Sequence, residues 1–199
     1  MSASAEKVVL VTGAGKGAGR RLAEAFAARG ATVAADDLTP VNLDETAARI
    51  TAAGGRVKAY VADIAKKMPV QGLLNQVLDD FGRLDVVVNC AEVEPQKPVL
   101  EMDEWDWQRT LDVNLTGAFL LTQSAGRIMK EKGGGIIVHV ARQARGPEGR
   151  AAYSASKAGL EALAACAADE FAAFGVRVLL HAGGEEEVER LVRLCLEAA

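Results

Sequence analysis

The chain has 199 residues, of which 50% are hydrophobic and 25% are charged, and its formal net charge is −4. That length allows one domain with a buried core, and the composition is typical of a globular protein rather than a disordered one. Because 23 basic residues face 27 acidic ones and no basic run occurs, nucleic acid is not expected as the main partner. The apolar runs are too short to span a membrane.

Sulfur and imidazole groups are few and scattered. The three cysteines, Cys90, Cys166 and Cys195, form no CxxC motif, and the two histidines, His139 and His181, stand alone. We therefore expect no zinc cluster and no disulfide framework, but reduced cysteines in a cytoplasmic protein. No signal peptide is expected either, since a strand-like segment starts almost at once.

Strand-like and helix-like segments alternate in the first half of the chain. A Val-rich run at residues 7–12 is followed by a glycine-rich turn and by an Ala/Leu-rich helix at 20–29. The next expected elements are a strand at 32–35, a helix at 42–53, a strand at 56–61, a helix at 70–81 and a strand at 84–89.

The second half continues the alternation. Asp103 can cap a long helical stretch that passes through Asn114 and ends near Lys130, before three glycines. The remaining expected elements are a strand at 136–140, a helix at 154–174, a strand at 176–180 and a helix at 185–196. The last helix starts with three glutamates, which suit the positive end of a helix dipole.

The strands are apolar throughout rather than alternating, as at Val86–Val88. This pattern indicates burial on both faces and therefore a parallel sheet covered by helices. About six such strands predict an α/β, doubly wound, Rossmann-like fold with helices on both faces. With no linker or repeat in sight, residues 1–199 are expected to form a single dinucleotide-binding domain.

The turn at residues 12–19 reads Thr-Gly-Ala-Gly-Lys-Gly-Ala-Gly, between a strand and a helix. Glycines there allow a tight turn and let a pyrophosphate approach the backbone at a helix N-terminus. Gly13, Gly17 and Gly19 are the foremost candidates for cofactor contacts, with Gly15 and Lys16 in the same turn. The alternative is a turn that serves helix–sheet packing only. A P-loop is not indicated, because no Gly-Lys pair here is followed by the Ser or Thr that a P-loop needs.

Asp36 and Asp37 end the second strand, about 20 residues after the turn, where a carboxylate can bind a ribose 2′-hydroxyl. A carboxylate there repels a 2′-phosphate, which favours NAD, with NADP less favoured. Lys16 acts in the opposite direction, because a cation tolerates that phosphate. The alternative for the aspartate pair is a helix cap or a solvated loop.

Two motifs give the chain a family likeness. The turn fits the pattern TGxxxGxG, and residues 153–157, Tyr-Ser-Ala-Ser-Lys, fit YxxxK. Together with the order of strands and helices, they make essentially the whole chain resemble the short-chain dehydrogenase/reductase family. The resemblance implies an NAD(H)-dependent oxidoreductase that interconverts an alcohol and a carbonyl by hydride transfer.

Tyr153 and Lys157 lie four residues apart and so share one helix face. An ammonium near a phenol lowers the phenol's pKa from about 10, so such a tyrosine can donate or accept a proton. The resemblance makes Tyr153 the catalytic acid/base, assigns Lys157 also to the nicotinamide ribose, and gives Asn114 a place in a proton relay. Without the full pattern, Tyr153 and Lys157 would be an ordinary surface pair.

The resemblance also assigns residues around the cofactor. Asp63 and Ile64 are implied as the adenine contact, while Asn89 and Ala91 belong to a segment beside the cofactor. That segment reads Asn-Cys-Ala-Glu here, whereas the family has Asn-Asn-Ala-Gly. Glu92 thus puts a charge where glycine lets the cofactor lie close.

The chain departs from the family at the end of the fifth strand as well. The family's second serine there polarises the substrate carbonyl, but this chain has Ala141 and Arg142. Arg142 or Gln143 are candidate replacement donors. Loss of such a donor costs about 10²–10³ in rate where it has been measured.

After the sixth strand, the resemblance implies a substrate-covering segment and a seventh strand, and neither is recognisable here. An open site that accepts a small or bulky carbonyl or alcohol is therefore expected, with strand six as an edge. The resemblance also implies a homodimer through the Asn114 and Tyr153 helices. No membrane partner is expected, because the apolar runs are short.

A second class of function stays open. The missing serine, Glu92 and the absent lid favour a catalytically impaired NAD-binding protein that acts as a sensor or scaffold subunit. The complete set of Tyr153, Lys157 and Asn114 favours the enzyme. A methyltransferase is the weakest alternative, because it leaves the YxxxK motif unexplained.

Overall fold

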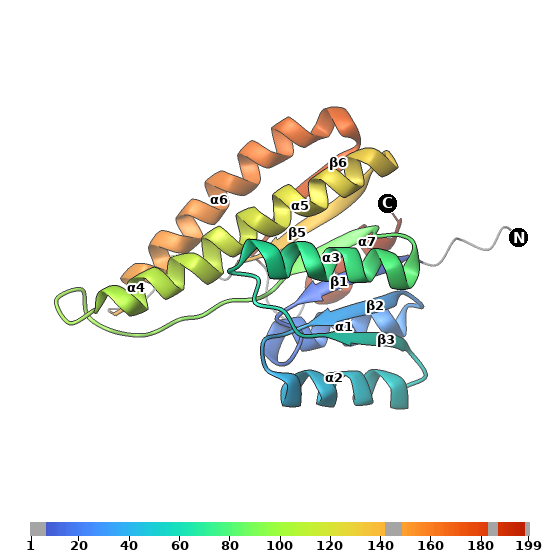
Figure 1. Ribbon diagram of the computed structural model, residues 1–199, viewed down its shortest axis with the longest axis horizontal. Coiled ribbons are helices and arrows are strands. Elements are labelled where there is room, and N and C mark those ends of the chain that lie inside the picture. Colours follow the sequence, from blue (N-terminus) through green and yellow to red (C-terminus); the bar gives the residue numbers. More distant parts are fainter. Residues whose placement is uncertain (1–6, 142–148, 183–186, 198–199) are drawn as a thin grey trace, which may run out of the picture.

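The computed structural model describes residues 7–141, 149–182 and 187–197. A parallel sheet runs through this part of the chain, with its strands in the order β3-β2-β1-β4-β5-β6 (Figure 1). The strands are β1 (Val8–Thr12), β2 (Thr32–Asp36), β3 (Arg56–Tyr60), β4 (Val86–Asn89), β5 (Gly135–Val140) and β6 (Val176–His181).

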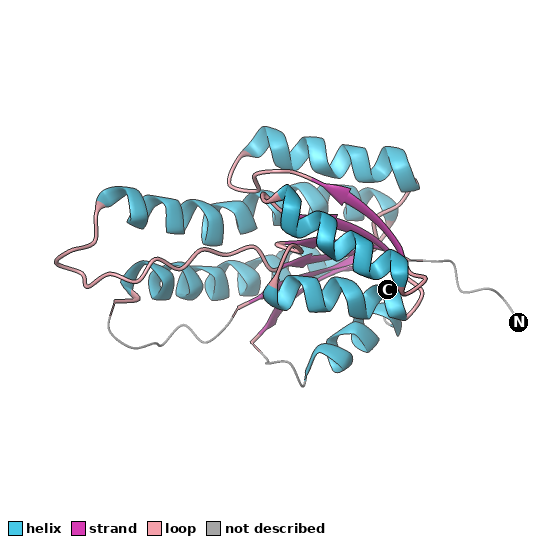
Figure 2. Cartoon of the chain, turned by 90° about the horizontal axis from the view of Figure 1, so that it is seen from below, coloured by secondary structure: helices cyan, strands magenta, loops and turns pink. Residues whose placement is uncertain are grey.

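Helices cover both faces of the sheet, as Figure 2 shows. One face carries α1 (Gly17–Ala28), α2 (Pro40–Ala52) and α7 (Val188–Glu197). The other face carries α3 (Lys67–Phe81), α5 (Gly117–Lys132) and α6 (Ala151–Phe171), the last followed by the 3₁₀ turn Ala172–Phe174. The predicted α/β, doubly wound, Rossmann-like fold is thereby confirmed.

Burial explains the apolar strands. All residues of β1, β2 and β4 are buried, so each must present an apolar side chain to both helix layers. In contrast, β3 lies at one edge and exposes Arg56 and Lys58. At the opposite edge of the described sheet lies β6, as expected.

The long helix expected from Asp103 to Lys130 forms, but it is interrupted. It consists of α4 (Glu104–Leu111), one π-helical turn at Asp112–Thr116, and α5. Asp103 caps α4 by accepting a hydrogen bond from the Asp106 N–H at 2.8 Å. Sequence periodicity did not indicate the π turn.

Other bounds differ slightly from expectation. The first and third helices begin at Gly17 and Lys67 rather than at 20 and 70, and β4 begins at Val86 rather than at 84. The last helix begins at Val188 rather than at 185. Glu185 and Glu186, expected in its first turn, lie outside the described residues.

The three cysteines differ in burial. Cys90, Cys166 and Cys195 are all free. Burial raises the pKa of the Cys195 thiol to about 11, which keeps it protonated in the core. No grouping of three potential metal ligands occurs among the described residues.

A chain of buried hydrogen bonds links β1, β4, β5 and α5. The Thr12 hydroxyl donates to Asn89 Oδ1 at 2.7 Å, and Asn89 Nδ2 lies 3.3 Å from His139 Nδ1. His139 Nε2 lies 2.8 Å from the Thr122 hydroxyl, which itself donates to the Ala118 carbonyl at 2.7 Å. All four side chains are almost fully buried, so the chain fixes the register of three strands and a helix.

These contacts determine the imidazole's protonation. Since Thr122 donates its proton to Ala118, it accepts from Nε2–H of His139. Nδ1 is then the acceptor for the Asn89 amide, and the ring is neutral. Burial, reinforced by the Lys157 charge, lowers the pKa of His139 from 6.5 to about 4.

We predict that His139 lowers the free energy of unfolding as the pH falls from about 6.5 to about 4, relative to the His139→Asn variant; the raised pKa of Asp36 acts in the opposite direction in both proteins. In that range the unfolded chain binds a proton at His139 and the folded chain does not, so folding is disfavoured; above pH 6.5 the residue contributes nothing. The full loss is on the order of 3 kcal/mol. Urea unfolding at pH 7, 5.5 and 4.5 measures it.

His139→Asn is expected to flatten this dependence, since it has no group that titrates there. The matched control is His181→Asn, because His181 is the other histidine and is less buried. Equal pH slopes in the wild type and in His139→Asn would contradict the prediction.

Candidate active site

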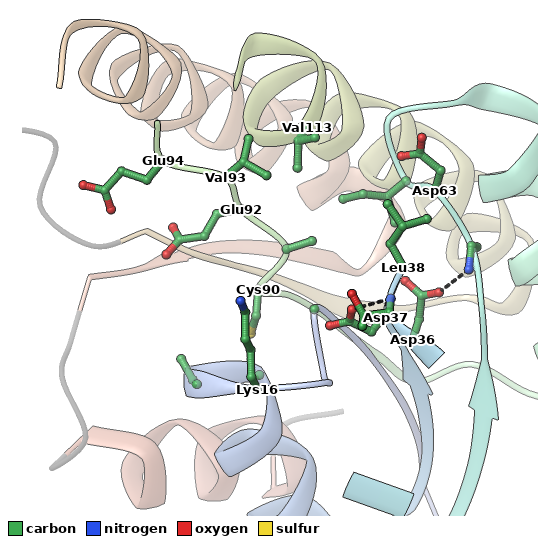
Figure 3. Close-up of a pocket in the computed structure, with 18 of the residues that line it drawn as sticks. Lys16, Asp36, Asp37, Leu38, Asp63, Cys90, Glu92, Val93, Glu94 and Val113 are labelled. Carbon is green, nitrogen blue, oxygen red and sulfur yellow. Dashed lines mark hydrogen bonds between the residues drawn. The ribbon is translucent and has the colours of Figure 1, made fainter. Parts of the chain in front are cut away.

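A cavity of about 570 Å³ opens at the carboxyl ends of the central strands (Figure 3). β1 lies between β2 and β4, so the strand order reverses there, and doubly wound sheets bind ligands at such a point. The glycine turn, the end of β2, the start of the β3–α3 connection and the segment after β4 all contribute to its wall.

The glycine turn approaches neighbouring backbone too closely for side chains. A Cβ on Gly13 would lie 2.7 Å from the Ala91 nitrogen, and one on Gly19 would lie 2.1 Å from the Gly13 carbonyl oxygen. Gly13 and Gly17 also have positive φ angles of 66° and 58°. Gly13, Gly17, Gly19 and Lys16 line the cavity, with the N-terminus of α1 directed at it.

Gly15 has a different place. Its N–H donates to Asp37 Oδ2 at 2.9 Å, and a Cβ would lie 2.7 Å from that same oxygen. Asp37 also accepts a hydrogen bond from the Thr39 N–H at 2.8 Å. Gly15 therefore holds Asp37 in position at the cavity rather than lining it.

The two aspartates of the pair differ in their surroundings. Asp36 is 1% exposed, and its Oδ1 accepts a hydrogen bond from the Ala62 N–H at 2.9 Å. Burial, together with the charges of Asp37 and Asp63, raises the pKa of Asp36. Asp37 is only half-buried, so the pair supplies one accessible carboxylate, at Asp37.

Asp63 and Ile64, in the β3–α3 connection, both line the cavity. Asp63 accepts a hydrogen bond from the Ala65 N–H at 3.0 Å, and Arg109 Nη1 from α4 lies 3.7 Å from its other oxygen. Ile64 packs against Gly117, where a Cβ would lie 3.0 Å from the Ile64 carbonyl oxygen. This corner combines an apolar side chain with a charged pair.

The segment after β4 forms a further wall. Ala91 lines the cavity and lies against Gly13, whereas Asn89 is 3% exposed and is committed to the buried hydrogen-bond chain. Figure 3 shows Glu92, Val93 and Glu94 following one another along this wall. Asn89 therefore holds the end of β4 in place and does not line the cavity.

Tyr153 and Lys157 lie one turn apart near the start of α6, and both side chains are buried. The Tyr153 hydroxyl donates to Glu92 Oε2 at 3.0 Å, and Lys157 Nζ lies 2.8 Å from the same oxygen. The Lys157 ammonium also lies 5.1 Å from the centre of the Tyr153 ring. Neither residue lines the described cavity, but Glu92 does.

Asn114 joins this group through its neighbours. Its Nδ2 donates to the Val93 carbonyl at 2.9 Å and to Ser156 Oγ at 3.1 Å, and its Oδ1 accepts from the Val93 N–H at 2.8 Å. Ser156 in turn donates to the Tyr153 carbonyl at 2.7 Å. Asn114 therefore fastens the segment after β4 to α6, and it lies in the π turn that sequence reasoning missed.

Arg150 is a site residue that sequence reasoning also missed. Its guanidinium stacks 4.8 Å from the centre of the Tyr153 ring and is ion-paired with Glu94. Two positively charged groups, those of Arg150 and Lys157, thus lie close to the phenol ring. No short motif indicates this arrangement, because Arg150 and Glu94 come from distant parts of the chain.

The family's serine position has no hydroxyl. Ala141 follows β5, is 6% exposed, and cannot donate a hydrogen bond through its side chain. The two candidate replacements, Arg142 and Gln143, lie outside the described residues. Separately, no described helix is long and apolar enough to cross a bilayer.

Known proteins resemble the chain over most of its length. The short chain dehydrogenase family model matches residues 7–189. D-threitol dehydrogenase from Mycolicibacterium smegmatis is 40% identical over 174 residues, which cover 86% of this chain and 67% of that protein.

Solved structures agree. A metagenomic short-chain oxidoreductase in complex with NADP has a TM-score of 0.91 at 30% identity, covering 99% of this chain and 94% of the other. NAD⁺-bound xylitol dehydrogenase has a TM-score of 0.85 at 32% identity, covering 97% and 77%. The chain therefore belongs to the short-chain dehydrogenase/reductase family of oxidoreductases.

Proposed function

We propose that the protein is an NAD(H)-dependent oxidoreductase that interconverts an alcohol and a carbonyl, with Tyr153 as the acid/base. The observation that carries the proposal is the Tyr153–Lys157 pair on α6, tied through Ser156 and Asn114 to the segment that walls the cavity. The glycine turn and Asp37 line the cavity at the strand-order reversal, and Glu92 on the same wall contacts the pair.

The cavity wall fits a dinucleotide. Gly13 and Gly19 leave no room for a Cβ, so the turn packs tightly against Ala91 and against itself. The N-terminus of α1 then offers N–H groups to a pyrophosphate. Asp37 is the residue to hold a ribose, and Asp63 and Ile64 would border the adenine. When bound, the nicotinamide supplies or accepts the hydride.

The side chains of the chain itself handle the proton. Tyr153 Oη holds a proton that it gives to the substrate oxygen during reduction and takes back during oxidation. Lys157, 5.1 Å from the ring centre, stabilises negative charge as it develops on the phenol oxygen. Asn114 keeps α6 and the cavity wall in register, which holds Tyr153 in place.

A second candidate, an NAD-binding protein without turnover that serves as a sensor or scaffold subunit, is favoured by two observations. Tyr153 is fully buried behind Glu92, and Ala141 offers no hydroxyl for a carbonyl. NADH binding with no turnover on any of a panel of aldehydes, ketones and sugar alcohols would favour this candidate.

Tyr153→Phe is expected to lower kcat at least 100-fold while changing the NADH Kd less than threefold. The change removes the transferable proton, and positioned acid/base groups contribute about 10²–10⁴ in rate. Tyr60→Phe is the matched control, since Tyr60 is the only other tyrosine and its hydroxyl binds Asp80 at 2.7 Å, outside the cavity wall. Turnover that survives in Tyr153→Phe rules out the acid/base role.

Asp37→Asn is expected to lower the preference for NADH over NADPH at least tenfold. The amide keeps an oxygen that can accept the Gly15 N–H but loses the charge that repels a 2′-phosphate. Calorimetric titration with each cofactor gives the ratio of Kd values. Asp44→Asn, an exposed change on α2, serves as the control; an unchanged ratio in Asp37→Asn would mean that the ribose contact lies elsewhere.

The protein is further proposed to form a homodimer through α4, α5 and α6, the helices that carry Asn114 and Tyr153. Apolar side chains on these helices support this interface: Trp105 is 72% exposed and Phe119 is 43% exposed. A cytoplasmic location stays a prediction from the sequence.

Phe119→Glu is expected to weaken dimerisation at least tenfold, measured by sedimentation equilibrium. Burying an aromatic side chain contributes about 1.5–3 kcal/mol, and a buried charge would oppose association. Val41→Glu on α2 adds the same charge at an exposed apolar site on the opposite face and is expected to have no effect. Equal dimer affinity in the two variants would argue for another interface.

A further inference from the structure

Glu92 occupies the two donors on which the proposed chemistry depends. Its Oε2 accepts a hydrogen bond from the Tyr153 hydroxyl at 3.0 Å and lies 2.8 Å from Lys157 Nζ. A substrate oxygen would need the same two donors, the Tyr153 hydroxyl and the Lys157 ammonium. We propose that Glu92 is an intramolecular competitor, whose carboxylate must leave Tyr153 before a substrate oxygen can bind there.

The contact is stabilised by the burial of its partners. Lys157 is 3% exposed and Tyr153 is 0% exposed, so a charge on the ammonium needs a close anion. Leaving a buried charge without its partner is strongly unfavourable, which disfavours a vacant Tyr153–Lys157 pair. The Glu92 side chain is 22% exposed and lines the cavity, so it provides that anion from the accessible side.

Displacement of Glu92 would occur by side-chain rotation rather than by movement of the segment. The next residue, Val93, is held through both its N–H and its carbonyl by Asn114 at 2.8 and 2.9 Å. The backbone beside Glu92 is therefore fixed, while its carboxylate faces a cavity into which it can turn. Figure 3 shows Glu92 on this wall next to Val93.

The chemistry of the contact identifies a ligand class. With residue 92 reduced to glycine, the hydroxyl of Tyr153 and the ammonium of Lys157 would lose the Glu92 carboxylate, and a small free carboxylate would complement them in charge and hydrogen bonding. Acetate is the simplest such probe, because it carries the same group as the glutamate side chain. The wild type should reject acetate, since Glu92 is already in place.

This inference rests on the proposed function, in that Tyr153 and Lys157 are taken as the site of the substrate oxygen. The test is calorimetric titration of sodium acetate at constant ionic strength into the wild type, Glu92→Gly and Glu92→Gln. Glu101→Gln is the matched control, because Glu101 is an exposed carboxylate on the same β4–α4 connection. Thermal unfolding establishes that each variant is folded.

Acetate is expected to bind Glu92→Gly at least tenfold more tightly than the wild type or Glu101→Gln, with Glu92→Gln intermediate because the neutral amide pairs less well with Lys157. If Glu92→Gly does not fold, Glu92→Gln carries the same comparison. Adding Tyr153→Phe to the tighter-binding variant is expected to reduce the gain, because one of the two donors is lost while Lys157 remains; such a reduction would locate the acetate at the pair.

Equal acetate affinity in all variants, or a gain that Tyr153→Phe leaves unchanged, overturns the inference. Parallel NADH titrations separate its failure from that of the proposed function. Acetate binding to Glu92→Gly without NADH binding supports the competition and removes the oxidoreductase proposal. NADH binding with no acetate gain in any variant overturns the competition alone.

Discussion

The buried ammonium of Lys157 determines how the candidate site is built. A cation that is 3% exposed must be close to an anion, and Glu92 reaches it from a segment 65 residues away in the chain (157 − 92). Tyr153 shares that anion, so the phenol and the ammonium have one common partner. The Val93–Asn114 hydrogen bonds hold the segment that brings Glu92 there.

Two polar systems thus meet at the carboxyl ends of the strands. Below the cavity, Thr12, Asn89 and His139 connect β1, β4 and β5 through buried hydrogen bonds. Beside it, Asn114 and Ser156 connect the cavity wall to α6. The first system is neutral and sets the strand register, whereas the second contains charges and lies next to the proposed chemistry. The charge of Lys157 reaches both, because it also disfavours protonation of His139.

Much of this could be predicted from the sequence, because it depends on local patterns. Apolar runs such as Val86–Val88 determine a doubly covered parallel sheet, and the glycine turn is recognisable because its residues are consecutive. The four-residue spacing of Tyr153 and Lys157 places them on one helix face without further information.

The remaining features depend on contacts between distant segments. Asp36 and Asp37 are adjacent in sequence, and only the contacts with Ala62 and Gly15 distinguish the buried carboxylate from the accessible one. The Glu92 side chain is oriented by its contacts with Tyr153 and Lys157 on α6, so the sequence alone indicated only a charge at an unusual position. A polar residue within an apolar strand, such as His139, indicates that a buried hydrogen-bond partner exists. It does not indicate which residue that partner is, and here it is Thr122.

The π turn at Asp112–Thr116 sets the rotation of α4 relative to α5 about the helix axis. Each residue of an α-helix advances the side chains by about 100°, and a π turn inserts one residue without lengthening the helix by a full turn. Without that insertion, α4 would be rotated by about 100° relative to α5. Arg109 would then point away from Asp63 while Leu121 kept its place in the core. The extra residue rotates α4 relative to α5 about the helix axis. One continuous helix can therefore present side chains to the cavity at one end and to the hydrophobic core at the other.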